Sequence, residues 1–372
     1  MRVEVPISVT SSPQMYDESS TRNIMWSVFF CLLPAAFWGV FIFGLSALGV
    51  LLAALASAAL FEFLFARLAG QDCPLWDGSA CVTGLLVGMT LPPSVPLYVP
   101  VFASLFAIGV VKWTFGGLGR NWMHPALGGW LFVYFSWPRA MTTWTFPRFL
   151  PSPDAVSSAT PLGLLKTGIV EETVLPPSPL EYLASLGYPE SSVDAVLSPW
   201  LNASILEPLG ISLPSGYVDL FLGIMPGSIG EVSAFLLLAS TVFLLARKIL
   251  SPAIPAAYFG VFGFFVWVFG GLQYGGEYFT GDVLFHIFTG GLLLGVFYMA
   301  ADIVASPVTL RGQLIFGSGA GFLTFLIRFY GASPEGAGLA ILAMNVFTPL
   351  INRLTPPVRF GAPVRGRGRT HE

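Results

Sequence analysis

A cluster of hydroxyl side chains lies in a long polar stretch of this chain, residues 138–216. It follows an aspartate, in the segment Asp154-Ala155-Val156-Ser157-Ser158-Ala159-Thr160. Serine and threonine hydroxyls in a loop that water reaches can take covalent modifications, phosphate esters among them. The segment is therefore the first candidate site for chemistry, and the elements around it must explain where it is held.

The composition is that of a membrane protein. Of the 372 residues, 55% are hydrophobic and only 10% are charged, and the mean hydropathy is +0.76. A soluble chain carries about 25% charged residues, and one helical span needs roughly 20 mostly apolar residues. We therefore expect an all-α polytopic membrane protein with about ten transmembrane helices. The apolar runs that predict them are approximately 24–44, 46–66, 79–91, 97–114, 124–137, 217–249, 253–271, 281–303, 312–330 and 335–352.

Three of these runs are irregular. Runs 79–91 and 124–137 are short and flanked by Pro or Gly, and run 217–249 is interrupted at Pro226-Gly227-Ser228-Ile229-Gly230. Irregular backbone at membrane depth persists only where it is buried in protein or lines a cavity. Broken helices of this kind point to a binding site. The alternative is that these runs are ordinary helices with poorly defined ends.

The distribution of basic residues predicts the orientation. Lys and Arg fall on the connections that ten spans place on the side of the N-terminus, at Arg67, Lys112, Arg120, Arg247, Lys248, Arg311 and Arg353. By the positive-inside rule the polar segment 1–23 and the basic tail 353–372 face the cytoplasm. Loop 138–216, with seven acids against Arg139, Arg148 and Lys166, then faces outward. We find no convincing cleavable signal sequence.

Two halves of five spans each, residues 24–137 and 217–352, flank the outer loop. An odd number of spans per half predicts that the halves are inverted repeats. A short internal sequence repeat supports this, because Thr83-Gly84-Leu85-Leu86 resembles Thr289-Gly290-Gly291-Leu292. Small residues in such helices are also common packing devices.

Metal and catalytic signatures are missing from the sequence. Cys31, Cys73 and Cys81 show no CxxC spacing, whereas an iron–sulfur cluster takes four thiolates. A cluster shared with another subunit stays open, although small buried side chains are the simpler interpretation. The three histidines are scattered, and no phosphate-binding loop, dinucleotide fingerprint or triad is present. We expect no metal site, no catalytic residue and no nucleic-acid partner.

Acidic residues inside apolar runs are costly and are functional candidates by default. They are Glu62, Asp77, Glu231, Asp282 and Asp302. The alternative for most of them is a position at the level of the lipid headgroups. Glu231 and Asp302 are the stronger candidates, because each adjoins broken or small-residue backbone.

Several motifs in the same order resemble the RnfD/NqrB family of membrane subunits of ion-translocating oxidoreductases. They cover nearly the whole chain, and the chain's length favours the Rnf type over the longer NqrB type. The motifs are Asp77–Ala80, Thr83–Leu86, Thr90–Pro93, Gly116–Asn121 with Pro125 and Ala126, Gly227–Glu231, Ser306–Thr309 with Gly312, and Tyr330–Gly331 with Pro334–Gly336 and Asn345.

The resemblance implies a covalent flavin. Residues 154–160 are similar to the family's D-x-x-S-G-A-T signature, in which FMN is joined through its phosphate to the threonine. This makes Thr160 the anchor, with Asp154 and Ser157 as parts of the signature. Ser158 replaces the usual glycine, and serine adopts positive φ less readily. A flavin transferase is the implied partner for attachment.

The resemblance also implies a second, non-covalent flavin, riboflavin. The family positions that hold it match Thr83, Asn121, His124 and Asp302. His124 replaces an asparagine; its ring can still hydrogen-bond a flavin edge and can titrate near neutral pH. The alternative is that Asn121 and Asp302 only cap broken helices.

The implied function is electron relay within an Rnf-type complex linked to ferredoxin and NAD. The chain would be one subunit of an ion-translocating oxidoreductase, not catalytic alone, in contact with other membrane and peripheral subunits and the lipid bilayer. The implied location is the bacterial cytoplasmic (inner) membrane, and the implied fold is urea-transporter-like. The alternatives are an NqrB-like subunit of a sodium-pumping NADH:quinone reductase, and a secondary transporter or channel without redox function.

Overall fold

A computed structural model describes residues 20–71, 74–150, 159–170, 178–210, 213–274 and 276–357. Within these ranges the chain is helical and contains no β-strand. Five helical stretches are long and apolar enough to cross a membrane. They are Thr21–Phe43, Leu45–Leu68, Ala253–Tyr274, Leu310–Tyr330 and Ala337–Leu354. The expected all-α polytopic membrane class is therefore confirmed at this level.

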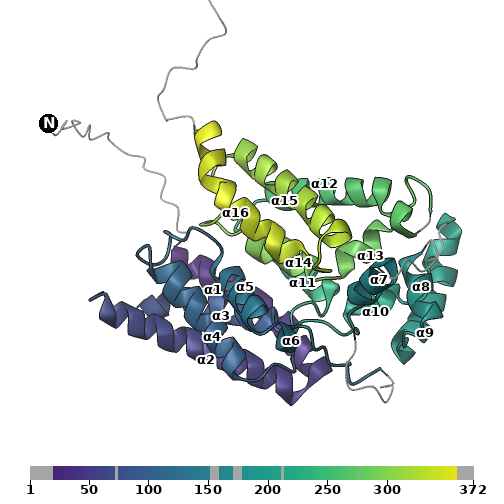
Figure 1. Cartoon of the computed structure of the whole chain (residues 1–372), viewed down its shortest axis with the longest axis horizontal. Coiled ribbons are helices and arrows are strands. Elements are labelled where there is room, and N and C mark those ends of the chain that lie inside the picture. The colour runs from purple at the N-terminus through teal and green to yellow at the C-terminus, as the bar shows by residue number, and fades with distance from the viewer. Residues whose placement is uncertain are drawn as a thin grey trace, which may run out of the picture.

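The first half of the chain forms one bundle (Figure 1). Its elements are α1 (Thr21–Phe43), α2 (Leu45–Leu68), the 3-10 turn η1 (Pro74–Asp77), α3 (Ser79–Met89), α4 (Tyr98–Leu105), the π-helix η2 (Phe106–Trp113), α5 (Pro125–Ser136) and α6 (Pro138–Met141). The α3 helix lies against both α1 and α2.

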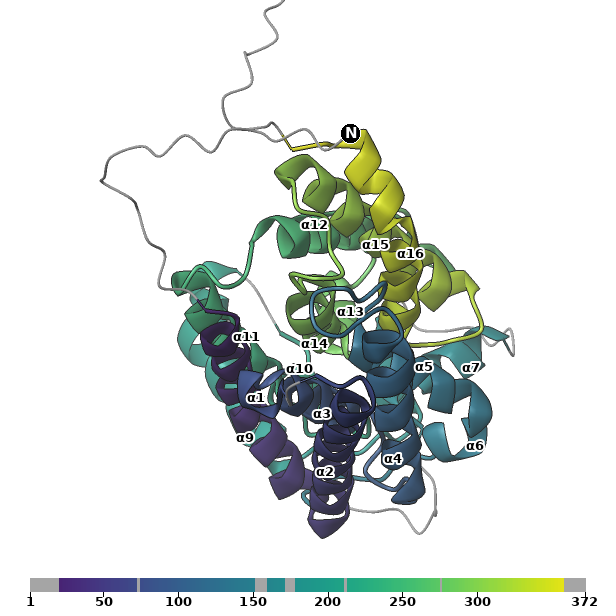
Figure 2. The ribbon, with the colours of Figure 1, turned by 90° about the vertical axis from the view of Figure 1, so that its left-hand side faces the viewer.

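The second half forms a second bundle (Figure 1). Its elements are α10 (Tyr217–Leu222), α11 (Ala234–Ala246), α12 (Ala253–Phe269), the 3-10 turn η5 (Gly271–Tyr274), α13 (Val283–Phe288), α14 (Leu292–Leu294), the π-helix η6 (Gly295–Ala300), α15 (Leu310–Tyr330) and α16 (Ala337–Leu354). The two bundles meet where α1 contacts α11 and where α5 contacts α16, and both contacts can be followed in Figure 2.

Short helices occupy the stretch between the halves. They are α7 (Pro161–Val170), α8 (Pro179–Ser185), α9 (Ser192–Leu201), the π-helix η3 (Asn202–Leu206) and the 3-10 turn η4 (Glu207–Leu209). In Figure 1 they gather on the right, whereas α1 begins and α16 ends on the left. The two ends of the described chain thus lie away from the part of the molecule that carries Thr160.

Glycines allow the tightest helix contacts. A Cβ on Gly84 would lie 2.9 Å from the carbonyl oxygen of Ala54, so α3 approaches the backbone of α2 directly. A Cβ on Gly321 would lie 2.5 Å from the carbonyl oxygen of Tyr258, which brings α15 against α12 in the same way. Small residues at membrane helix interfaces act through this close approach. The Thr83–Leu86 motif therefore includes a packing glycine.

The expected interruption of run 217–249 is present, because α10 ends at Leu222 and α11 begins at Ala234. Two amides of the segment between them bond to carbonyls at and just after the end of α3. The amides of Ile229 and Gly230 donate to the carbonyls of Leu91 and Met89 at 3.1 and 2.7 Å. The non-helical segment is thus buried in protein, as membrane depth demands.

The two copies of the short internal sequence repeat differ in local structure. Thr83–Leu86 lies inside the continuous helix α3, whereas Thr289–Gly291 separates α13 from α14. Both Gly290 and Gly291 have positive φ, of 71° and 62°, and Thr83–Leu86 has no glycine in that conformation. The extra glycine at 291 accounts for the break, because an L side chain rarely adopts this backbone.

Candidate functional site

Thr160 caps the start of α7. Its Oγ1 accepts a hydrogen bond from the Gly163 amide at 3.0 Å, and its carbonyl accepts from the Leu164 amide at 3.0 Å. This is the geometry of a helix N-cap, with Pro161 at the first helical position where its missing N–H is harmless. The side chain is 6% exposed. Asp154 and Ser157 lie outside the described residues.

The α7 helix is fastened to the second bundle. Lys166 Nζ donates to the carbonyls of Arg328 and Phe329 at 3.0 and 2.9 Å, and burial lowers its pKa. One turn earlier, near the start of the helix, Leu162 fills the space beside Gly290, where an added Cβ would lie 2.6 Å from Leu162 Cδ1. The hydroxyl of Thr160 is therefore held in a fixed place relative to the membrane helices.

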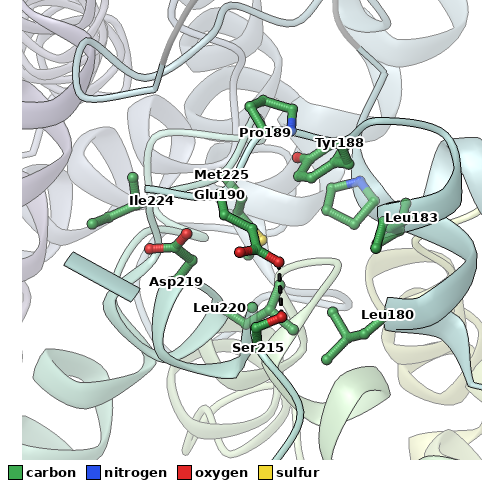
Figure 3. Close-up of a pocket in the computed structure, with 13 residues that line it drawn as sticks. Leu180, Leu183, Tyr188, Pro189, Glu190, Ser215, Asp219, Leu220, Ile224 and Met225 are labelled. Atoms are coloured by element: carbon green, nitrogen blue, oxygen red, sulfur yellow. Dashed lines mark hydrogen bonds between the residues drawn. The ribbon is translucent and has the colours of Figure 1, made fainter. Parts of the chain in front are cut away.

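A small cavity lies beside the start of α7, next to Thr160. Pro161, the residue after Thr160, lines it with apolar residues of α8 and α10, and Figure 3 shows Tyr188, Glu190 and Asp219 around it. Ser215 donates to Glu190 Oε1 at 2.8 Å. The Tyr188 hydroxyl is buried without a hydrogen-bond partner among the described residues, and burial, together with the charge of Asp219, raises the pKa of Tyr188. The cavity volume is only about 30 Å³.

His124 and Asp302, predicted from opposite halves of the chain, line one pocket of about 60 Å³. His124 caps α5, since its Nδ1 accepts from the Leu127 amide at 3.4 Å. Asp302 accepts from the Ala305 amide at 3.3 Å. Both side chains thus have a structural role and still face a shared space.

The other two members of this predicted set lie apart from the pocket wall. Thr83 is buried, with 8% of its surface exposed. Two nearby residues of α3, Val82 and Leu86, line the pocket, whereas Thr83 does not. Asn121 is not among the lining residues either, and it does not cap α5. Its Oδ1 is nevertheless buried with no hydrogen-bond partner in the described part of the chain. An orphaned buried oxygen of this kind suits a donor from a ligand.

A larger cavity continues from this pocket. Its volume is about 580 Å³, and it lies between the α11–α12 connection and the segment that follows η6. The two share four lining residues, Ile249, Leu250, Ala301 and Ile303. A drug-sized ligand needs roughly 300–1,000 Å³, so the larger cavity has the room that the smaller pocket lacks.

A buried charged group lies where the breaks in the second half converge. Arg328 of α15 is 3% exposed and donates to the carbonyls of His286, Thr289 and Glu335. Glu231 is 7% exposed, and its Oε2 accepts from the Ser228 amide at 2.7 Å. The sequence analysis included Glu335 only as part of the Pro334–Gly336 motif and did not single out Arg328, because it considered basic residues on connections and not those inside apolar runs. An arginine inside the apolar run 312–330 was the available signal.

A second buried charged group lies in the first half. Lys112 Nζ lies 2.8 Å from Glu62 Oε1 and donates to Ser79 Oγ at 2.7 Å. Ser79 in turn donates to Asp77, the last residue of η1. The expectation that Lys112 lies on a connection between spans is wrong, because this lysine is 1% exposed in the last turn of η2. Pairing with a carboxylate explains why a charge can be retained there.

The surroundings of the remaining ionisable candidates indicate structural roles. Asp282 caps α13 through the Phe285 amide at 3.0 Å and accepts from the Tyr217 hydroxyl. Cys31 is buried and Cys81 is half-buried, whereas Cys73 lies outside the described residues. Across the described ranges no three His, Cys, Asp or Glu side chains gather as a metal site would require.

Comparison with known proteins finds similar chains along nearly the whole sequence. Residues 8–361 match the family described as NQR2, RnfD, RnfE. The D subunit of the proton-translocating ferredoxin:NAD(+) oxidoreductase complex of Clostridium ljungdahlii is 40% identical over 354 residues, covering 95% of this chain and 96% of that protein. The D subunit of the Na(+)-translocating ferredoxin:NAD(+) oxidoreductase complex of Acetobacterium woodii is 36% identical over 360 residues, 96% of each chain. The D subunit of the ion-translocating oxidoreductase complex of Stutzerimonas stutzeri is 35% identical over 356 residues, 94% of each.

The helices and the buried charges between them define a multi-pass membrane protein. With the match covering nearly its whole length, the chain belongs to the NQR2, RnfD, RnfE family. The resemblance found in its motifs is thereby confirmed.

Proposed function

We propose that this chain is the D subunit of an Rnf-type ion-translocating ferredoxin:NAD oxidoreductase and relays electrons through FMN bound covalently to Thr160. The similarity to relatives carrying that name, over 94–96% of the chain, is the observation that carries the proposal. The chain would act with the other membrane and peripheral subunits of the complex, and a flavin transferase would attach the FMN. On its own, outside the complex, the chain would not be catalytic.

The proposed architecture has ten spans in two inverted five-helix repeats, 24–137 and 217–352, arranged as in urea transporters. Each of the ten predicted apolar runs contains a helix. Besides the five long stretches, Ser79–Met89, Tyr98–Trp113 and Ala234–Ala246 are shorter apolar helices. Helices this short can form part of a membrane span only where neighbouring helices cover their ends.

The proposed orientation places both termini in the cytoplasm and residues 138–216 outside the bacterial inner membrane. The Lys/Arg asymmetry supports it. The arrangement in Figure 1 agrees, since α7–α9 lie at the end of the molecule away from the start of α1 and the end of α16.

Thr160 suits a phosphate ester. An ester on its Oγ1 would lie at the N-terminus of α7, where the Gly163 amide already donates at 3.0 Å. The positive end of a helix dipole and its free N–H groups favour phosphate. FMN, when bound, supplies the redox chemistry. The chain's own contribution is to hold the phosphate and, through Lys166 and Leu162, to fix α7 on the membrane helices.

The small size of the neighbouring cavity supports a covalent attachment. A space of about 30 Å³ cannot enclose a flavin ring, since enclosing pockets measure roughly 300 Å³ or more. The ring would therefore extend outside this cavity, where burial contributes little affinity. An ester bond prevents its loss to the outer compartment and leaves the ring open to a partner subunit.

Riboflavin is proposed for the cavity that adjoins His124 and Asp302. The 580 Å³ space has the necessary room, and the 60 Å³ pocket presents an imidazole and a carboxylate at its end. These groups can hydrogen-bond a ring edge and a ribityl hydroxyl. The orphaned Oδ1 of Asn121, three residues before His124, supports a polar ligand in this region.

Activity of the assembled complex tests the proposal. Thr160→Ala should abolish ferredoxin-dependent NAD reduction by the purified complex while the other subunits still co-purify. Thr167→Ala is the matched control, because Thr167 is an exposed threonine on the same helix whose hydroxyl donates to the Gly163 carbonyl at 3.0 Å. Full activity in Thr160→Ala would remove the electron-relay role.

A further inference from the structure

The α9 helix buries polar side chains and exposes apolar ones. Its buried residues are polar, namely Ser191 at its N-cap, Asp194 and Ser198. Its face opposite them is apolar and exposed, with Val193, Val196, Leu197 and Trp200 exposed by 37, 69, 37 and 56%. These four residues have the spacing i, i+3, i+4, i+7, which is one stripe of a helix. A helix on the surface of a soluble domain turns such a stripe toward the core.

The inward polar face is fully engaged, so the orientation of α9 is fixed. Asp194 accepts from the amides of Gly216 and Val218 at 2.8 and 3.1 Å and from Ser198 Oγ at 3.0 Å. The Ser191 amide donates to Asp219 at 2.8 Å. Rotating α9 to bury its apolar stripe would break these bonds and leave a buried carboxylate unpaired, which is costly.

The apolar stripe continues into an apolar groove of the second bundle. The groove has a volume of about 390 Å³ and runs from Leu197 and Leu201 of α9 to Phe221, Phe235, Leu284 and Phe288 of α10, α11 and α13. Phe235 and Leu284 are 51 and 50% exposed. Both lie in the first turn of helices in runs that carry the composition of membrane spans, so the stripe on α9 is continuous with a surface of that composition.

We propose that α9 lies in the outer boundary of the bilayer and that lipid acyl chains of the leaflet on the side of α7–α9 cover its stripe and fill the groove. Contiguous exposed apolar surface of this kind marks a membrane or protein contact. Protein interfaces carry about one hydrogen bond per 100–200 Å² and a polar rim. Among the described residues no charged side chain lines this groove, and its one hydroxyl, on Tyr217, is already bonded to Asp282. Trp200 at the end of α9 suits the headgroup level, where Trp is enriched.

Collision accessibility of a nitroxide label tests the environment of the stripe. Val196→Cys would be labelled in a chain whose native cysteines are replaced by alanine, within the whole complex in nanodiscs. Its relaxation would be measured with oxygen, which partitions into lipid, and with a neutral nickel chelate, which stays in water. Val242→Cys on α11, 64% exposed, is the lipid reference. Ser185→Cys, exposed on α8, is the water reference.

We expect Val196 to match Val242, with an oxygen-to-nickel accessibility ratio several-fold above that at Ser185. A ratio like that at Ser185 would place the stripe in water and overturn the proposal. Protection from both reagents would show a protein partner on the stripe and would overturn it equally. Val193→Cys, on the same stripe, repeats the measurement if the label at position 196 disturbs assembly.

Discussion

Lys112 and Glu62 form an ion pair that solvent does not reach: their side chains are 1 and 0% exposed, and Nζ lies 2.8 Å from Oε1. The lysine also donates to Ser79, so one ammonium joins α2, α3 and η2. Glu62 Oε2 has no partner among the described residues. The pair therefore depends on one cation to keep a buried carboxylate satisfied.

Lys112→Met should destabilise the protein strongly, by about 3–5 kcal/mol, because it leaves the Glu62 charge buried and unpaired. Adding Glu62→Gln should recover most of that loss, since the remaining amide is neutral. Thermal unfolding of the purified chain in detergent measures both variants. Equal destabilisation in the single and double variants would mean that packing of the Lys112 stem, and not its charge, stabilises this site.

Arg328→Lys should lower the thermal unfolding midpoint clearly, although the charge is kept. The guanidinium donates to three carbonyl oxygens on two segments, the end of α13 and the connection before α16, and one ammonium cannot reproduce that fork. Losing one or two charge-assisted hydrogen bonds costs about 3 kcal/mol. Arg311→Lys, at an exposed position in the first turn of the same helix, should change the midpoint little. Matching midpoints for the two variants would contradict the role given to Arg328.

Acid extraction of purified protein should release riboflavin while FMN stays on the chain. The double variant Asn121→Leu, Asp302→Leu should lose the extracted flavin and retain the covalent one, because it removes an orphaned acceptor and a carboxylate that faces the pocket. Chromatography of the extract identifies the flavin. If wild-type protein from a riboflavin-replete host releases none, both residues act only in the local backbone structure.

Cysteine labelling in intact cells tests the orientation. Ser185→Cys should react with a membrane-impermeant maleimide added outside, whereas Arg353→Cys, in the last turn of α16, should react only after permeabilisation. The asymmetry of Lys and Arg between the two sides is the reason. Labelling of both positions from the same side would show that the number of spans between them is even, against the expected five.

The membrane class and the positions of the helices followed from the sequence because hydropathy is a local property. The break after Leu222 was also visible, since Pro226, Gly227 and Gly230 cannot extend a helix cheaply. The pairing of Lys112 with Glu62 could not be predicted from the sequence, because these residues are 50 positions apart and meet only once α2 packs against η2. The same holds for Arg328 and the carbonyl of His286.

Thr160 is proposed as the FMN anchor because of its sequence signature and not because of its geometry. A threonine before Pro161 is a helix-start signal, and that signal predicts the capping role the structure gives to Thr160. His124 and Asp302 were grouped by resemblance, and the structure places them in one pocket. Thr83 and Asn121 lie outside its wall, because side-chain direction on α3 and in the 116–124 loop depends on packing that no local pattern encodes.

The intact mass of the chain, co-expressed with a flavin transferase, is the most direct test of the central claim. Wild-type protein should exceed the polypeptide mass by one FMN less one water and should fluoresce after denaturation. Thr160→Ala should show the bare mass and no fluorescence, whereas Thr160→Ser, which keeps a hydroxyl at the helix cap, and Thr167→Ala should retain both. A flavin still bound in Thr160→Ala, or a bare mass for the wild type, would contradict the account.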